Sequence, residues 1–136
     1  DVEKVYGNTF GVLESAHAAL VTSGTATLET ALFDVPQVVC YKVPAGWAAA
    51  IFKKLFIKVR FVSLVNLISF AEVVPELLGN DMNPDNVRKH LLPLLSDTLE
   101  RAMQKENYKQ MKTILGPAGA PDHAAEQIIN LLNIKA

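Results

Sequence analysis

The four residues Thr22-Ser23-Gly24-Thr25 have the side-chain types and the setting needed to bind a phosphate. The apolar residues 18–21 predict a buried strand before them, and residues 26–33 predict a helix after them. Backbone N–H groups at the start of a helix attract phosphate oxygens, and Gly24 lets a ligand approach the backbone closely. Glu29 lies about one turn further along, where its carboxylate can accept two hydrogen bonds from a ribose diol. The segment therefore offers a pyrophosphate site beside a sugar site.

A simpler interpretation of this pattern stays open. A Ser/Thr turn before a helix often serves only to cap the helix, through Ser23 or Thr25 in this chain. A glutamate in the first or second helical turn, such as Glu29, is often a solvated residue that suits the positive end of the helix dipole. The elements around the turn therefore matter to the ligand interpretation.

The apolar runs indicate how the turn is positioned. Residues 18–21 and 37–43 are continuous rather than alternating apolar runs, and a predicted helix separates them. Such strands are typical of a parallel sheet covered by helices on both faces, which predicts an α/β, Rossmann-like fold. Ligands of these folds bind at the carboxyl ends of the strands, where the turn lies.

Further elements are expected along the rest of the chain. Residues 2–6 indicate the end of a strand, and Asn8 or Thr9 can cap a short helix that ends at Ser15. Residues 61–65 predict another strand, and residues 72–78 predict a helix. Four more helices are expected: over residues 47–60, from Pro84 after an Asn83 cap, over residues 97–115, and from Pro121 after a loop.

Three polar residues, Ser63, Asn66 and Glu76, lie in otherwise apolar surroundings. Asn66 closes an apolar run, so its side chain either hydrogen-bonds a ligand or forms a local turn. The single cysteine, Cys40, lies within an apolar strand, which predicts a buried and inert thiol. The histidines share no metal-ligand spacing with it or with a carboxylate, so we expect no metal site.

The charges are unevenly distributed over the 136 residues, half of which are apolar. The net charge of −1 argues against a general nucleic-acid binder. Residues 35–71 contain no acid and carry five cations, so they contribute +5 while the rest of the chain carries −6. The helix expected there either packs with its lysines in solvent or faces an anionic membrane or an acyl chain. The residues of that surface would be Trp47, Phe52, Lys53, Lys54, Phe56 and Lys58.

Four blocks in order carry a resemblance to a known family. Residues 19–29 (ALVTSGTATLE) resemble the donor-site motif of the lipid-A-disaccharide synthases. Residues 36–41 (PQVVCY), 61–67 (FVSLVNL) and 74–78 (VPELL) follow with a similar spacing. The resemblance implies a glycosyltransferase of GT-B fold, which has two Rossmann-like halves. The chain would be the later part of the C-terminal half, which binds most of the nucleotide sugar.

The domain organisation also follows from the resemblance. Residues 1–115 would form a partial UDP-sugar-binding domain. Residues 116–136 would add a loop and a helix that pack on this domain or return to an N-terminal half. The chain opens without a methionine, and we expect it to be a fragment of a longer protein.

The resemblance further implies an activity and its site residues. UDP-2,3-diacylglucosamine would donate its sugar to 2,3-diacylglucosamine 1-phosphate, with inversion, at the cytoplasmic face of the inner membrane of Gram-negative bacteria. Ser23, Gly24 and Thr25 would hold the pyrophosphate and Glu29 the uridine ribose, while Asn66 and Glu76 match positions near the donor site. The transfer needs no metal or other cofactor if helix N–H groups stabilise the departing UDP.

Other functions remain open on the residues alone. The same turn and glutamate would suit a UDP-sugar 2-epimerase or another UDP-sugar transferase of GT-B fold. A non-catalytic module that docks a membrane or a partner through residues 47–60 would bind no nucleotide. An exposed sheet edge would favour pairing with a second copy, and hence a homodimer. The general base is expected in the N-terminal half, so we predict that this chain alone is inactive.

Overall fold

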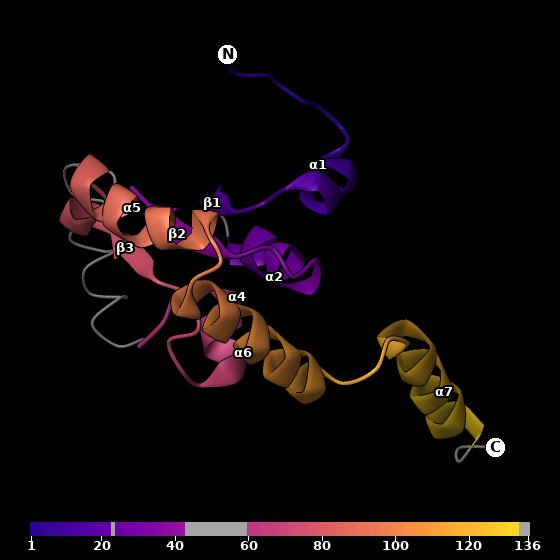
Figure 1. Ribbon diagram of the computed structural model, residues 1–136. Helices are drawn as coiled ribbons and strands as arrows, with labels where there is room; N and C mark the ends of the chain where they lie inside the picture. The colour runs from indigo at the N-terminus through magenta and orange to yellow at the C-terminus, as the bar shows by residue number, and fades with distance from the viewer. Residues whose placement is uncertain (23, 43–59, 134–136) are drawn as a thin grey trace, which may run out of the picture.

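The computed structural model describes residues 1–22, 24–42 and 60–133 (Figure 1). Ser23 of the predicted phosphate-binding turn lies outside the described residues. The same holds for the surface expected to face a membrane or an acyl chain, which comprises Trp47, Phe52, Lys53, Lys54, Phe56 and Lys58.

A three-stranded parallel sheet forms the centre of the chain, in the order β1-β2-β3. The strands are β1 (Ala19–Val21), β2 (Gln37–Tyr41) and β3 (Glu76–Leu78). Val39 in the middle strand pairs with Val21 on one side and with Glu76 on the other. The α/β fold predicted from continuous apolar strands is confirmed, and it is compatible with a Rossmann-like part of a GT-B fold.

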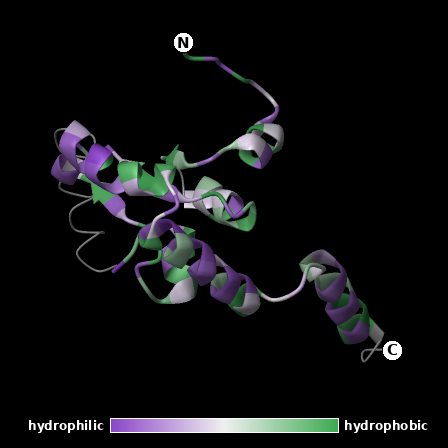
Figure 2. Cartoon of the chain, viewed as in Figure 1, coloured by the Kyte–Doolittle hydropathy of each residue, from purple (hydrophilic) through white to green (hydrophobic). Residues whose placement is uncertain are grey.

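Helices cover both faces of this sheet (Figure 1). Helices α2 (Gly24–Leu32), α4 (Leu64–Ser69) and α6 (Leu99–Leu115) pack together over one face, around the buried side chain of Val39. Helix α5 (Pro84–Leu91) and the short 3-10 helix η2 (Leu92–Leu95) cover the other face, where Val38 and Cys40 lie. Figure 2 shows the apolar strands between these helices.

Two predicted elements between residues 61 and 78 are wrong. The strand expected over residues 61–65 is instead the start of α4, because Ser63 caps a helix by accepting a hydrogen bond from the Asn66 N–H. The helix expected over residues 72–78 is instead an extended segment that ends in β3. Pro75 disfavours helical geometry at the preceding Val74, and its own carbonyl accepts from the Val39 N–H at 2.9 Å.

The ends of the chain differ from its centre. Residues 2–6, expected to end a strand, are exposed and irregular. Helix α1 (Thr9–Ser15) follows, and of the two expected caps, Asn8 and Thr9, Asn8 caps it. Helix α7 (Ala120–Asn133) lies apart from the sheet in Figure 1, beyond residues 116–119. Its apolar residues Ile128, Ile129, Leu131 and Leu132 are 55–65% exposed.

Among the described residues, no helix is both long enough and apolar enough to cross a membrane.

A buried polar cluster joins β2 to two of its covering helices. The Gln37 N–H donates to Gln104 Oε1 of α6 at 2.7 Å, and Gln104 Nε2 donates back to the Gln37 carbonyl. Gln37 Nε2 donates to the Thr27 carbonyl of α2 and to the Tyr108 hydroxyl of α6. That hydroxyl in turn lies 3.0 Å from Gln104 Oε1. These bonds fix the amino end of the middle strand against both helices.

Replacing Tyr108 with Phe is expected to lower the free energy of unfolding by about 1–3 kcal/mol, because Gln37 and Gln104 each lose a buried partner. Burial raises the pKa of the Tyr108 phenol. The native protein therefore keeps this proton when the unfolded chain has lost it, and the free energy of unfolding falls as the pH rises above about 10. The variant should show a shallower fall in urea unfolding at alkaline pH.

The exposed Tyr6 provides the control, since Tyr6→Phe should change neither the stability nor its pH dependence. A Tyr108→Phe variant as stable as the parent, with the same alkaline slope, would contradict the prediction.

Candidate functional site

The predicted strand–turn–helix unit is present in the structure. Strand β1 ends at Val21, and α2 begins at Gly24, two residues earlier than the sequence suggested. Because the strands are parallel, the turn lies at the edge of the sheet where β2 and β3 also end. The N-terminus of α2 therefore faces the edge at which ligands of parallel sheets bind.

Gly24 is the residue at which a ligand can come closest to this backbone. Among the residues that the structure describes, a methyl group added at Gly24 would meet no atom within 4 Å, apart from its chain neighbours and its own helix. The packing of these described residues therefore does not require glycine here. A glycine that the packing does not need leaves open space at the helix N-terminus, as the approach of a phosphate would require.

The hydroxyl and acidic side chains of α2 divide into two groups. Thr27 and Thr30 are buried, and their hydroxyls donate to the carbonyls of Gly24 and Ala26 within the helix. Thr25 is exposed and Glu29 is half-buried. Their spacing of four residues places both on one face of α2, so the predicted phosphate and ribose ligands lie on adjacent turns.

Lys42, a residue of the basic segment that the sequence did not mark as a site residue, also lies at the carboxyl ends of the strands. It is exposed and follows directly on the last residue of β2, Tyr41. Its position immediately after a buried apolar strand was the signal that could have marked it, because that is where residues of a carboxyl-edge site occur. A lysine there adds positive charge near the N-terminus of α2.

Asn66 and Glu76 are brought together in a hydrogen-bond network with Ser63, in which Ser63 and Asn66 are completely buried and Glu76 is half-buried. Glu76 Oε1 accepts from the Ser63 N–H at 2.9 Å, from Ser63 Oγ at 2.7 Å and from Asn66 Nδ2 at 2.8 Å. Glu76 Oε2 accepts from the Val62 N–H at 2.9 Å. We call these three side chains the Ser63–Asn66–Glu76 network.

The Asn66 side chain is fully occupied within this network. Its Oδ1 accepts from the N–H groups of Val73 and Val74 at 2.7 and 2.9 Å, and its Nδ2 donates to the Val74 carbonyl as well as to Glu76. An amide has two donors and two acceptor lone pairs, and all four are used. Asn66 is also completely buried. These are the contacts of a residue that shapes its local turn.

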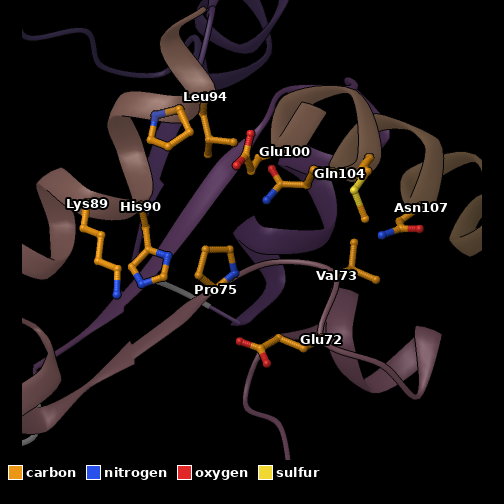
Figure 3. Close-up of a pocket in the computed structure, with 11 residues that line it drawn as sticks. Glu72, Val73, Pro75, Lys89, His90, Leu94, Glu100, Gln104 and Asn107 are labelled. Atoms are coloured by element: carbon orange, nitrogen blue, oxygen red, sulfur yellow. The ribbon is translucent and has the colours of Figure 1, made fainter. Parts of the chain in front are cut away.

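A cavity of about 430 Å³, shown with its lining in Figure 3, lies beside Pro75, which precedes β3, and beside Gln104, which bonds the first residue of β2. Lys89 and His90 approach it from α5, and Glu100 approaches it from α6. The lining carries charges of both signs, which does not favour an anion. Its residues come from segments scattered between positions 72 and 107, and no sequence motif marked it.

The remaining reactive groups take no part in these sites. Cys40 is buried, as predicted, and burial raises the pKa of its thiol, so the thiol stays protonated. Within the described parts of the chain, no three His, Cys, Asp or Glu side chains lie close enough to hold a metal ion.

Comparison with known proteins gives a consistent result. The lipid-A-disaccharide synthetase family matches residues 3–129. The lipid-A-disaccharide synthase of Anaeromyxobacter sp. (strain K) is 35% identical over 132 residues, which are 97% of this chain and 34% of that protein. The synthase of Syntrophus aciditrophicus (strain SB) is 34% identical over 131 residues, covering 96% of this chain and 34% of its own length. That of Prochlorococcus marinus (strain MIT 9313) is 38% identical over 117 residues, with 86% and 30% covered.

The chain thus spans about a third of the length of these curated relatives. The match extends through the turn at Gly24, the Ser63–Asn66–Glu76 network and most of α7. On this basis, the chain belongs to the lipid-A-disaccharide synthase family.

Proposed function

We propose that this chain is the donor-binding part of a glycosyltransferase that forms the lipid A disaccharide. The observation that carries the proposal is the open N-terminus of α2 at the carboxyl edge of a parallel sheet, in a chain of this family. The donor is UDP-2,3-diacylglucosamine and the acceptor is 2,3-diacylglucosamine 1-phosphate. The products are the lipid A disaccharide phosphate and UDP.

The residues of the turn and of α2 take separate roles in this proposal. Ser23, Gly24 and Thr25 hold the pyrophosphate of the donor, and the carboxylate of Glu29 accepts hydrogen bonds from the uridine ribose. Negative charge develops on the departing UDP as the glycosidic bond breaks. The N–H groups at the start of α2 point toward that charge and stabilise it without reorganising, which lowers the barrier to transfer.

The acyl chains of both substrates give a role to the acid-free basic segment, residues 35–71. Its cations suit the anionic surface of a membrane, and its aromatic residues suit the interface or an acyl chain. We infer a peripheral location on the cytoplasmic face of the inner membrane. Strand β1 is an edge of the sheet among the described strands, and this supports pairing in a homodimer.

The two parts of the chain divide this work. Residues 1–115 contain the sheet and the candidate donor site, and they form the UDP-sugar-binding domain. Residues 116–136 contain α7, whose exposed apolar side chains are suited to pack on this domain or on an N-terminal half.

Titration with UDP, followed by amide NMR of the isotope-labelled chain, tests the proposal directly. We expect shifts centred on residues 23–29. Glu29→Ala should weaken UDP binding about tenfold, because the ribose hydroxyls lose a charged acceptor. The control is Glu126→Ala, which removes an exposed carboxylate from α7 and should bind UDP like the parent. A folded chain that ignores UDP would refute the donor site and favour a docking module.

A substitution at Gly24 separates binding from folding. Gly24→Ala should leave the free energy of unfolding within about 1 kcal/mol of the parent, because the added methyl group meets no neighbouring atom. At the phosphate position that we propose, the same methyl group would contact the ligand, so UDP affinity should fall at least about tenfold. Urea unfolding and calorimetric titration measure the two effects. Unchanged UDP affinity would argue against a phosphate at this position.

We expect the chain by itself to have no transferase activity, since it covers about a third of its relatives and the general base is expected outside it. A radiolabelled donor and acceptor, separated by thin-layer chromatography after incubation, would reveal the disaccharide. Detectable product from the isolated chain would overturn this expectation and place the base within these residues.

A further inference from the structure

The carboxylate of Glu76 makes four hydrogen bonds, all with neutral donors. Two come from the backbone N–H groups of Val62 and Ser63, one from the Ser63 hydroxyl and one from the Asn66 amide. Hydrogen bonds to an ionised acceptor are stronger than those between neutral groups. These four bonds engage both oxygens of the half-buried carboxylate within the fold.

These bonds join three segments that are separate in sequence. Ser63 is the N-cap of α4, Val62 precedes it, and both lie in the acid-free basic segment. Glu76 is the first residue of β3, and Asn66 links both to the backbone of Val73 and Val74. The Ser63–Asn66–Glu76 network therefore fixes the position of residues 62–66 relative to β3.

The strand register and the helix packing connect this network to the donor turn. Glu76 pairs with Val39, which also pairs with Val21, so the Cα atom of Glu76 lies level with the last residue of β1 and about 10 Å across the sheet from it. Next to Asn66, Val65 is completely buried in the same cluster as Ala31 of α2. A shift of α4 would thus move the helix whose N-terminus forms the phosphate site.

We propose that Asn66 and Glu76 are positioning residues that hold α4, and through it α2, in the geometry needed to bind the donor, without touching the donor themselves. This inference rests on the proposed function, since it assigns a role in UDP binding. In this inference Asn66 and Glu76 affect donor binding indirectly, through the packed helices α4 and α2, and not by contacting the donor.

The sharpest test is Asn66→Asp, which keeps the shape of the side chain. The new carboxylate would face Glu76 across the 2.8 Å contact, and the pair would share one proton at low pH. At about pH 5 the shared proton restores the hydrogen bond to Glu76, although the bond to the Val74 carbonyl stays lost, whereas at about pH 8 the two charges repel and displace α4. Relative to the parent at the same pH, UDP affinity of the variant should be about tenfold weaker at the higher pH and partly recovered at the lower.

Two readouts separate positioning from the alternatives. During a UDP titration of the parent, the Asn66 side-chain NH₂ resonances should stay unchanged while the Gly24 and Thr25 amides shift. Gln110→Glu, which adds the same charge at an exposed site on α6, should bind UDP like the parent at both values of pH. Dissociation constants are measured on the folded variant, so a loss of stability alone would leave them unchanged.

A parent that does not bind UDP would overturn both the proposed function and this inference. A parent that binds UDP while Asn66→Asp binds equally well at about pH 8 would overturn the inference alone, as would a large shift of the Asn66 NH₂ resonances. If Asn66→Asp does not fold at the higher pH, Ser63→Ala decides, because it removes one donor to Glu76. A folded Ser63→Ala variant should bind UDP about threefold more weakly, and unchanged affinity would refute the inference.

Discussion

Val38 and Val39, adjacent residues in β2, are completely buried in two separate apolar clusters on opposite faces of the sheet. A strand covered on both faces must have helices on each side, and only crossover connections supply them between parallel strands. Because β2 pairs in parallel with both neighbours, the carboxyl ends of all three strands lie at the same end of the sheet. As a consequence, Lys42 lies at the same end of the sheet as the turn at Gly24.

Polar side chains fix the positions of the helices relative to the apolar sheet. Gln37 ties the amino end of β2 to α2 and α6, and Glu76 ties β3 to the start of α4. Both positions are within strands, where an unpaired polar group is costly, so the hydrogen bonds of each network favour one arrangement of the covering helices. Close apolar packing resists displacement of these helices, and the hydrogen bonds add a directional constraint to it.

The sequence predicted those features that depend on local patterns. Continuous apolar residues marked β1 and β2, and Asn8 and Asn83 were identified as helix caps because capping uses neighbouring residues. Residues 61–78 were misassigned because apolar runs in short strands and short helices look alike. The Gln37–Tyr108 contact and the cavity beside Glu100 join residues far apart in sequence, and no local pattern encodes them.

The open space beside Gly24 has an evolutionary meaning. Among the described residues, packing leaves room for an added methyl group there, so selection for a stable fold would let this position change from glycine to alanine. Asn66, which is completely buried and fully hydrogen-bonded, would be retained by selection for folding whether or not a ligand binds. Glycine at position 24 would therefore reflect selection for ligand binding. A related protein that has lost Gly24 but retains Asn66 would be one that kept the fold and no longer binds the ligand.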